Sequence, residues 1–317
     1  MHTSPTDAAR ALVGAVEQVV RGRRGAVELV ATAVLSGGHV LLEDVPGSGK
    51  TTLAKAFALA SGAGFGRIQA TGDLLPADIT GGGVWDAASG GFRFVPGPVF
   101  AHVLLVDELN RASPRSQSAF LEAMEEGAVT ADGRRHPLPD PFVVLATQNP
   151  VEQVGTHPLP ESQLDRFAVR VVLGPLGARD ERQVVRDQLR AATVGRVRPV
   201  LDVAGLRALR AAVREVHVAD AVVEHAVDVV RATRTDPRVL LGASARAAIA
   251  LVRCAQARAV LEGREHVLPC DVQALAVPVL AHRLVLAEPE HGAQGTALAQ
   301  QEVLARIVQQ VPVPVHR

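Results

Sequence analysis

The sequence predicts an open α/β sheet followed by an all-helical region, and three observations support this fold class. Short apolar runs alternate with helical segments in the first half of the chain. One of these runs leads through a glycine-bearing turn into a helix, at residues 41–56, "LLEDVPGSGKTTLAKA". From about residue 176 onward, apolar residues recur almost only at helical spacing.

The expected strands are short and almost wholly apolar. The first begins at residue 39, and the others cover residues 66–70, 102–107, 142–147 and 168–173. Because most of these runs do not alternate between apolar and polar residues, they are typical of parallel strands that are buried on both faces. In such a sheet, ligands bind at the carboxyl ends of the strands.

Helical spacing of apolar residues predicts helices around and after these strands. In the first region they cover residues 7–20, 26–35 and 116–126, and Gly37 and Gly38 end the second of them. In the second region they cover residues 180–190, 202–214, 220–234, 244–261, 270–285 and 296–308. We therefore divide the chain into an α/β core, residues 1–175, and a helical domain, residues 176–317.

The composition indicates a globular protein with balanced charge. Hydrophobic residues make up 48% of the chain, and 33 basic residues balance 33 acidic ones, so no binding to nucleic acid or to an anionic membrane is expected. Cys254 and Cys270 are too few for a disulfide framework or a metal cluster. The N-terminus does not resemble a signal peptide, and no apolar run approaches the length of a membrane span. We therefore expect a cytoplasmic protein.

A turn with the composition of a phosphate-binding loop follows the first strand. The signature GxxxxGK[ST] fits Gly49, Lys50 and Thr51, whereas Asp44 stands where its first glycine is expected. Backbone amides from Gly47 to Thr51 would surround phosphates at the positive end of the following helix. The Lys50 ammonium would bridge the β- and γ-phosphates, and the Thr51 hydroxyl would bind Mg²⁺. Because these amides begin at Gly47, we expect the Asp44 carboxylate to point away from the phosphates.

Two further strand ends carry side chains suited to the hydrolysis of a nucleoside triphosphate. The run "HVLLVDELNR" contains Asp107, which would bind the Mg²⁺, and Glu108, which would polarise the attacking water. The run "VVLATQNP" ends in Gln148 and Asn149, where an amide would position the water. An ordinary Asn-Pro turn explains this second pattern equally well.

Two arginines are candidates for contact with the γ-phosphate. Arg166 lies in "ESQLDRF", and Arg246 lies in "LGASARAAIAL" near the start of an expected helix. Each is equally typical of a solvated or ion-paired arginine, and spacing does not decide between these roles. The carboxylates Glu122, Glu125 and Glu126 are expected to form a solvated helix face, and contact with a neighbouring subunit stays open.

Two segments are expected to project from the core. Residues 72–100 are rich in Gly, Asp and Pro, and are too long for a simple connection. Residues 128–138, "AVTADGRRHPL", have an Asp-Gly turn between arms with β propensity, which predicts a hairpin.

With these motifs in this order, the chain resembles AAA+ ATPases, and among them the MoxR family. The resemblance covers residues 19–284 and rests on six blocks: "LLEDVPGSGKTTLAKA", "RIQATGDLLPADITG", "FVPGPVFAHVLLVDELNRASPRSQSAFLEAMEE", "VLATQNPVEQVGTHPLPESQLDRF", "LGASARAAIAL" and "VLAHRL". It implies an AAA+ P-loop NTPase core with a parallel sheet, followed by an all-helical lid domain. Ala245 stands where family members often have proline, which removes a preference at the helix start.

The resemblance implies roles for individual residues. Walker A would include Lys50 and Thr51, Walker B would be Asp107 and Glu108, sensor 1 would be Asn149, the arginine finger would be Arg166 and sensor 2 would be Arg246. The implied nucleotide-binding residues are Val20, Gly22, Pro46, Gly47, Ser48, Gly49, Lys50, Thr51 and Thr52, with Thr51 and Asp107 as Mg²⁺ ligands. Residues 72–100 correspond to the helix-2 insert, and residues 128–138 to the hairpin before sensor 1.

The resemblance also implies a way of working. Such proteins typically form hexameric rings with ATP and Mg²⁺ between subunits, and they remodel or activate protein complexes and metal-containing enzymes, often with von Willebrand factor A domain partners. We expect an ATP-hydrolysing chaperone of this kind. Two alternatives stay open: a nucleotide-dependent assembly module with little turnover, and a chelatase or DNA-directed AAA+ motor subunit. The balanced charge favours DNA least.

Overall fold

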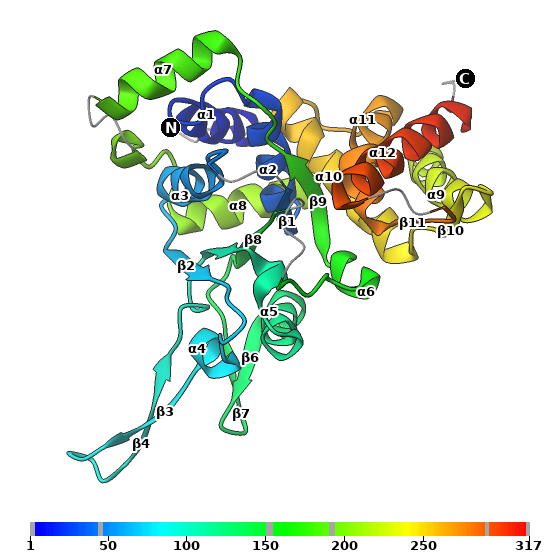
Figure 1. Ribbon diagram of the computed structural model, residues 1–317. Coiled ribbons are helices and arrows are strands. Elements are labelled where there is room, and N and C mark those ends of the chain that lie inside the picture. Colours follow the sequence, from blue (N-terminus) through cyan, green and yellow to red (C-terminus); the bar gives the residue numbers. More distant parts are fainter. Residues whose placement is uncertain (1–3, 44–46, 150–154, 190–193, 289–291, 315–317) are drawn as a thin grey trace.

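The centre of the molecule is a five-stranded parallel sheet with the order β2-β5-β8-β1-β9 (Figure 1). This computed structural model describes residues 4–43, 47–149, 155–189, 194–288 and 292–314. The strands are β1 (His39–Glu43), β2 (Phe65–Gln69), β5 (Val103–Asp107), β8 (Val143–Gln148) and β9 (Phe167–Val172). The predicted α/β fold class is confirmed.

The sheet is covered on both faces, which explains the unalternating apolar runs. On one face, Leu42 and Leu105 belong to a core that includes α1 (Pro5–Glu17), α2 (Arg24–Leu35) and α3 (Lys50–Ala60). On the other face, Leu41 and Leu104 pack in a cluster with Phe120 of α5 (Pro114–Glu126). Because successive strand residues point to opposite faces, both must be apolar where both faces are buried.

Two hairpins project together from one end of the core (Figure 1). The predicted Asp-Gly hairpin is present as β6 (Ala128–Ala131) and β7 (Arg134–Pro137), with positive φ angles at Asp132 and Gly133. Within residues 72–100, α4 (Pro76–Thr80) is followed by a second hairpin of β3 (Gly81–Asp86) and β4 (Gly91–Pro96). The rings of Phe94 and His136 stack at 3.8 Å, so the two hairpins contact one another.

The remainder of the chain is mainly helical. Its elements are α6 (Glu161–Leu164), α7 (Ala178–Leu189), α8 (Val203–Arg214), α9 (Asp220–Thr235), α10 (Ala245–Glu262), α11 (Pro269–Leu280) and α12 (Gly292–Gln310), with the short 3₁₀ turns η1 (Leu109–Arg111), η2 (Val194–Arg196) and η3 (Ala281–Arg283). A small antiparallel pair, β10 (Val239–Leu241) and β11 (Val285–Leu286), joins them. Among the described residues, no helix is long and apolar enough to cross a membrane.

The helix expected over residues 270–285 is shorter than the sequence predicts. It ends at Leu280, and the chain then turns so that His282 Nε2 and Arg283 Nη2 donate to the Phe167 carbonyl at 3.0 and 2.7 Å. These two bonds fix the chain to the first residue of β9. The helix therefore ends where the chain contacts a distant strand. The spacing of apolar residues along the sequence gives no information on such a contact.

His39 is a buried histidine that links three elements of the core. Its Nδ1 accepts the Val144 amide at 3.0 Å, and its Nε2–H donates to the Met124 carbonyl at 3.1 Å, so the ring is neutral. The pKa of His39 is lowered to about 4, mainly by burial and to a smaller extent by the charge of Arg210, while the hydrogen bond to Met124 opposes the shift. Protonation would remove the acceptor for Val144 and place a charge in the core.

We expect His39 to make the protein less stable in acid. The pKa of His39 is lower in the folded protein than in the unfolded chain. Between these two pKa values the unfolded chain therefore binds more protons. As the pH is lowered through this range, the free energy of unfolding decreases by up to about 3 kcal/mol. Urea unfolding at several pH values should give a shallower pH dependence for His39→Gln than for the wild type. The exposed His266→Gln is the control, and parallel curves for His39→Gln and the wild type would contradict this assignment.

Candidate nucleotide-binding and catalytic site

The carboxyl ends of the strands form one edge of the sheet, which we call the carboxyl edge. Neighbouring strands are in register there, with Glu43 beside Gln148 and Gln69 beside Asp107. The glycine turn follows β1 at this edge, Glu108 follows β5, and Asn149 follows β8. Three groups that the sequence suggested for nucleotide chemistry are therefore brought to one edge by the parallel direction of the strands.

The described part of the glycine turn fits a phosphate group. Gly47 and Gly49 have φ angles of 80° and 93°, and a Cβ built on either would meet no atom within 4 Å. The Ser48 hydroxyl is buried and has no hydrogen-bond partner in the described part of the chain. The helix α3 begins at Lys50, so its free amides face this turn. Asp44 and Pro46 lie outside the described residues.

Arg23 is a second cationic side chain at this turn, and the sequence analysis missed it. It is only 9% exposed and its Nη1 donates to the Ser48 carbonyl. The sequence contains a hint of this contact, because Arg21, Arg23 and Arg24 lie at and just after the segment that is expected to border the adenine. The contact fixes the turn from the side of α2.

A cavity of about 480 Å³ lies beside the start of α3. Its lining comes from three segments: Gln18, Val19 and Arg21; Thr52 and Lys55 of α3; and Val184, Asp187, Val194, Gly195 and Arg196. The ion pair of Arg21 Nε with Asp187 Oδ2, at 2.9 Å, joins two of these segments.

The two residues expected to border the adenine, Val20 and Gly22, are not among the lining residues, although Val19 and Arg21 beside them are. Val20 is buried in the apolar core. Gly22 has a positive φ of 69°, which favours glycine, and a Cβ there would lie 2.5 Å from Asp180 Oδ2, so a larger residue would displace the Asp180 side chain.

Asp107 and Thr51 offer the type of ligand that Mg²⁺ prefers. Both side chains present oxygen atoms, and the remaining ligands of an octahedral ion would come from phosphate and water. The Asp107 carboxylate is 10% exposed, and its Oδ2 accepts from Arg67 Nε at 2.7 Å. This bond leaves the other carboxylate oxygen, Oδ1, for a metal ion.

Glu108 is held in an unusual backbone conformation. Its φ and ψ of 56° and 47° are left-handed, which costs a residue other than glycine about 1–2 kcal/mol. Its amide donates to Thr147 Oγ1 at 2.9 Å, and its Oε2 accepts from Gln69 Nε2 at 3.2 Å and pairs with Arg111 Nε at 3.0 Å. Strain of this kind clusters at active sites, where neighbours hold it in place. Sequence analysis did not identify Gln69 or Arg111.

The end of β8 borders a further cavity of about 470 Å³, which reaches the helical domain. Gln148, Asn149, Glu43 and Arg170 are among its lining residues. Arg170 pairs with Glu43 at 3.6 Å and donates to Gln300 Oε1 of α12 at 3.0 Å. Burial raises the pKa of Glu43, and the charge of Arg170 opposes this shift. The last residue of β1 is thereby linked to α12.

Arg166 and Arg246 lie away from these groups, at the amino ends of the strands. Arg166 directly precedes β9, and its Nη2 pairs with Glu125 Oε2 at 2.6 Å. Arg246 lies in the first turn of α10, and its Nη2 pairs with Glu125 Oε1 at 2.8 Å. Glu125 itself follows Met124, whose carbonyl contacts His39 at the start of β1.

The length of β1 therefore separates the two arginines from the glycine turn. It has five residues, which correspond to about 13–17 Å at the usual rise of a strand. An arginine that contacts Glu125 at the amino ends cannot also contact a phosphate at the carboxyl edge of the same chain. Both arginines lower the pKa of Glu125, Arg246 mainly through its hydrogen bond.

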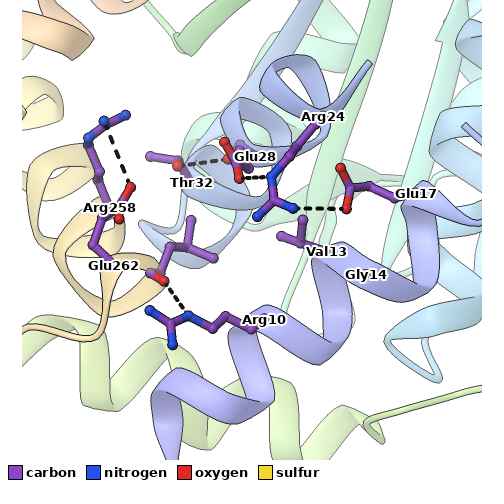
Figure 2. A pocket seen from close by; sticks show the side chains of 10 residues that line it. Arg10, Val13, Gly14, Glu17, Arg24, Glu28, Thr32, Arg258 and Glu262 are labelled. Carbon is purple, nitrogen blue, oxygen red and sulfur yellow. Dashed lines mark hydrogen bonds and ion pairs between the residues drawn. The ribbon is translucent and has the colours of Figure 1, made fainter. Parts of the chain in front are cut away.

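Another cavity, of about 410 Å³, lies between α1, α2 and α10 (Figure 2). Its charged lining consists of three arginines and three glutamates: Arg10, Arg24, Arg258, Glu17, Glu28 and Glu262. Arg24 pairs with Glu28 at 2.8 Å and with Glu17 at 3.6 Å, and Arg258 pairs with Glu262 at 3.9 Å. Because these charges offset one another, the cavity lacks the surplus positive charge that a triphosphate needs.

Comparison with known proteins identifies the class first. The model of the ATPase family associated with various cellular activities (AAA) matches residues 39–169, and that of the AAA lid domain matches residues 231–306. The first match contains four of the five central strands and the start of β9, with the glycine turn, Asp107, Glu108 and Asn149, and the second contains α10 and α11. The fold is an AAA+ core followed by a helical lid.

Individual relatives then identify the family. The chain is 38% identical to the chaperone MoxR1 of Mycobacterium tuberculosis over 94% of this chain and 80% of that protein. It is 44% identical to the protein YeaC of Bacillus subtilis over 95% and 93% of the two chains. A solved structure from Cytophaga hutchinsonii has a TM-score of 0.89 and 34% identity, covering 98% of this chain and 96% of the other. The chain belongs to the MoxR family of AAA+ ATPases.

We expect the left-handed conformation of Gly49 to be required for nucleotide binding. A side chain at this position would cost about 1–3 kcal/mol, so Gly49→Ala should weaken the binding of a fluorescent ATP analogue by about tenfold or more. Gly14→Ala in α1 is the matched control, because a Cβ there meets no atom within 4 Å. An unchanged Kd for Gly49→Ala would exclude the turn from the phosphate site.

Proposed function

We propose that this protein hydrolyses ATP in a ring in which neighbouring subunits share each site. The separation of Arg166 and Arg246 from the glycine turn by the length of β1 carries this proposal. In a ring, the amino ends of the strands in one subunit would face the carboxyl edge of the next. Such head-to-tail contacts close when the rotation between subunits permits, and we propose a hexamer.

One subunit would bind the nucleotide. The adenine would enter the cavity beside α3, backed by Val20 and Gly22, and Thr52 would lie near the α-phosphate. Amides of Gly47, Ser48 and Gly49, with Pro46 preceding them, would surround the phosphates, and Lys50 would bridge the β- and γ-phosphates. Thr51 and Asp107 would hold Mg²⁺, which neutralises phosphate charge. Glu108 would polarise the attacking water, and Asn149 would orient it.

The neighbouring subunit would complete the site. Arg166 and Arg246 would contact the γ-phosphate and stabilise the charge that develops on it in the transition state. The Arg246 side chain is 55% exposed, which supports a contact outside its own chain. Because Arg246 belongs to the lid and Arg166 to the core, loss of the γ-phosphate would change the position of the lid.

The proposed cellular role is that of a cytoplasmic chaperone that remodels or activates a protein complex, including one that takes part in metal-enzyme maturation. A relative named as a chaperone supports this role. The exposed rings of Trp85 and Phe92 on the β3–β4 hairpin, 58% and 76% exposed, would contact the client or a von Willebrand factor A domain partner. We also propose that the lid domain begins near residue 176 and the core ends at 175.

A nucleotide-dependent assembly module with little turnover is the second candidate. One observation favours it: Gln69 and Arg111 both hold Oε2 of Glu108, so that oxygen is already occupied and water would be polarised through Oε1.

We expect activity to return when two inactive variants are mixed. Glu108→Gln removes the group that polarises water. Arg166→Ala removes the arginine that contacts the nucleotide of the neighbouring subunit, and the loss of such an arginine commonly lowers the hydrolysis rate about a thousandfold or more. In an equal mixture, about one quarter of head-to-tail interfaces would combine an intact Glu108 with an intact Arg166. Steady-state ATPase measurements should recover that share of wild-type activity. No recovery at any ratio would refute shared sites.

Single-turnover hydrolysis distinguishes the two candidate functions. With enzyme in excess over ATP, the wild type should convert its bound nucleotide, and Glu108→Gln should slow this step by about a hundredfold or more. The nucleotide should stay bound to both proteins. Equal rates for the two proteins would favour the assembly module.

A further inference from the structure

We propose that Glu125 is a positioning residue that holds Arg166 and Arg246 as one unit for the site of the neighbouring subunit. This inference rests on the proposed function, because it takes both arginines to act in trans. It assigns a role to a carboxylate that, from the sequence, was expected to belong to a solvated helix face, with contact to a neighbouring subunit left open.

The geometry joins the two arginines through a single carboxylate. Glu125 Oε2 pairs with Arg166 Nη2 at 2.6 Å, and Oε1 accepts from Arg246 Nη2 at 2.8 Å. Arg166 comes from the core and Arg246 from the lid, while Glu125 lies in the last turn of α5. The two guanidinium groups carry like charges, and the carboxylate between them offsets their repulsion.

The junction between core and lid has its own contacts, independent of Glu125. Asp165, next to Arg166, accepts the Ser244 hydroxyl at 3.1 Å and pairs with Arg283 Nη1 at 3.0 Å. Ser244 is the N-cap of α10, so this contact already holds the start of that helix. Glu125 therefore orients the two guanidinium groups rather than joining the domains.

The same geometry leaves both arginines able to bind a phosphate. Each pairs with Glu125 through Nη2, and a guanidinium group has five N–H donors. The Arg166 Nε is buried and has no hydrogen-bond partner among the described residues. A carboxylate that inactivated the arginines would occupy both edges of each guanidinium. Here it pairs with one nitrogen of each guanidinium, and because the side chains of Arg166 and Arg246 are 27% and 55% exposed, other N–H groups can reach oxygen atoms of the neighbour's nucleotide.

The first experiment measures steady-state ATP hydrolysis by Glu125→Gln. This variant keeps the shape of the side chain and removes its charge, so it should no longer hold the two arginines in place. Because misplaced catalytic groups slow a reaction, kcat should fall by about tenfold or more. The KM should change less than about twofold, because the nucleotide-binding residues lie at the other edge. Glu122→Gln, an exposed carboxylate on the same helix, is the matched control and should behave as the wild type. A kcat for Glu125→Gln equal to or above that of the wild type would overturn the proposal.

Mixed assemblies separate positioning from a general structural defect. Glu125→Gln mixed with Glu108→Gln should regain activity, because the first variant supplies an intact Glu108 and the second supplies intact arginines with their Glu125. Glu125→Gln mixed with Arg166→Ala should regain no activity. Both changes affect the edge that carries the arginines, so no subunit in this mixture presents an intact arginine pair to its neighbour. Equal recovery in both mixtures would refute the positioning role.

Arg166→Ala alone separates failure of this inference from failure of the proposed function. If Arg166→Ala hydrolyses ATP as fast as the wild type, the arginines do not act in trans and both proposals fail. If Arg166→Ala is inactive while Glu125→Gln has wild-type kcat, the shared site stands and only the role of Glu125 is refuted.

Discussion

The parallel direction of five strands is the constraint on which the rest of this structure depends. It brings the ends of β1, β5 and β8 to one edge, where the glycine turn, Asp107, Glu108 and Asn149 meet. It also sends the start of β9, and with it Arg166, to the opposite edge. The two sets of candidate residues therefore lie at opposite edges of one sheet. Under the proposed function, they are the two halves of a site, and each subunit of a ring gives one half to its neighbour.

The lid is attached to this sheet through β9 and β1. The Phe167 carbonyl accepts from His282 and Arg283, and Arg170 connects Glu43 to α12. Desolvation lowers the pKa of His282 well below its ordinary value, so the ring stays neutral and donates through Nε2. The strand that leads into the glycine turn therefore shares a buried ion pair with a residue that contacts the lid.

Much of the fold could be predicted, because parallel strands that are buried on both faces appear in the sequence as short runs of consecutive apolar residues. The unalternating runs correspond to β1, β2, β5, β8 and β9, and the Asp-Gly pair corresponds to the β6–β7 turn. Prediction failed where distant contacts override local preference. The helix expected to reach residue 285 ends at Leu280, and the β3–β4 hairpin lies in a segment that the sequence described only as long and glycine-rich. Gly81 opens that hairpin against the backbone of β4, a close approach that a side chain would block.

The sequence alone determined the chemical types available for the site, since Lys50, Thr51, Asp107, Glu108 and Asn149 stand in recognisable motifs at strand ends. It could not determine how these groups are held. The left-handed backbone of Glu108, its contacts with Gln69 and Arg111, and the contact of Arg23 with the glycine turn all depend on segments remote in sequence. Tertiary structure also decided that Arg166 and Arg246 meet at Glu125, away from the glycine turn of their own chain. Spacing records the order of residues along the chain, whereas only the packed sheet fixes the edge at which each one lies.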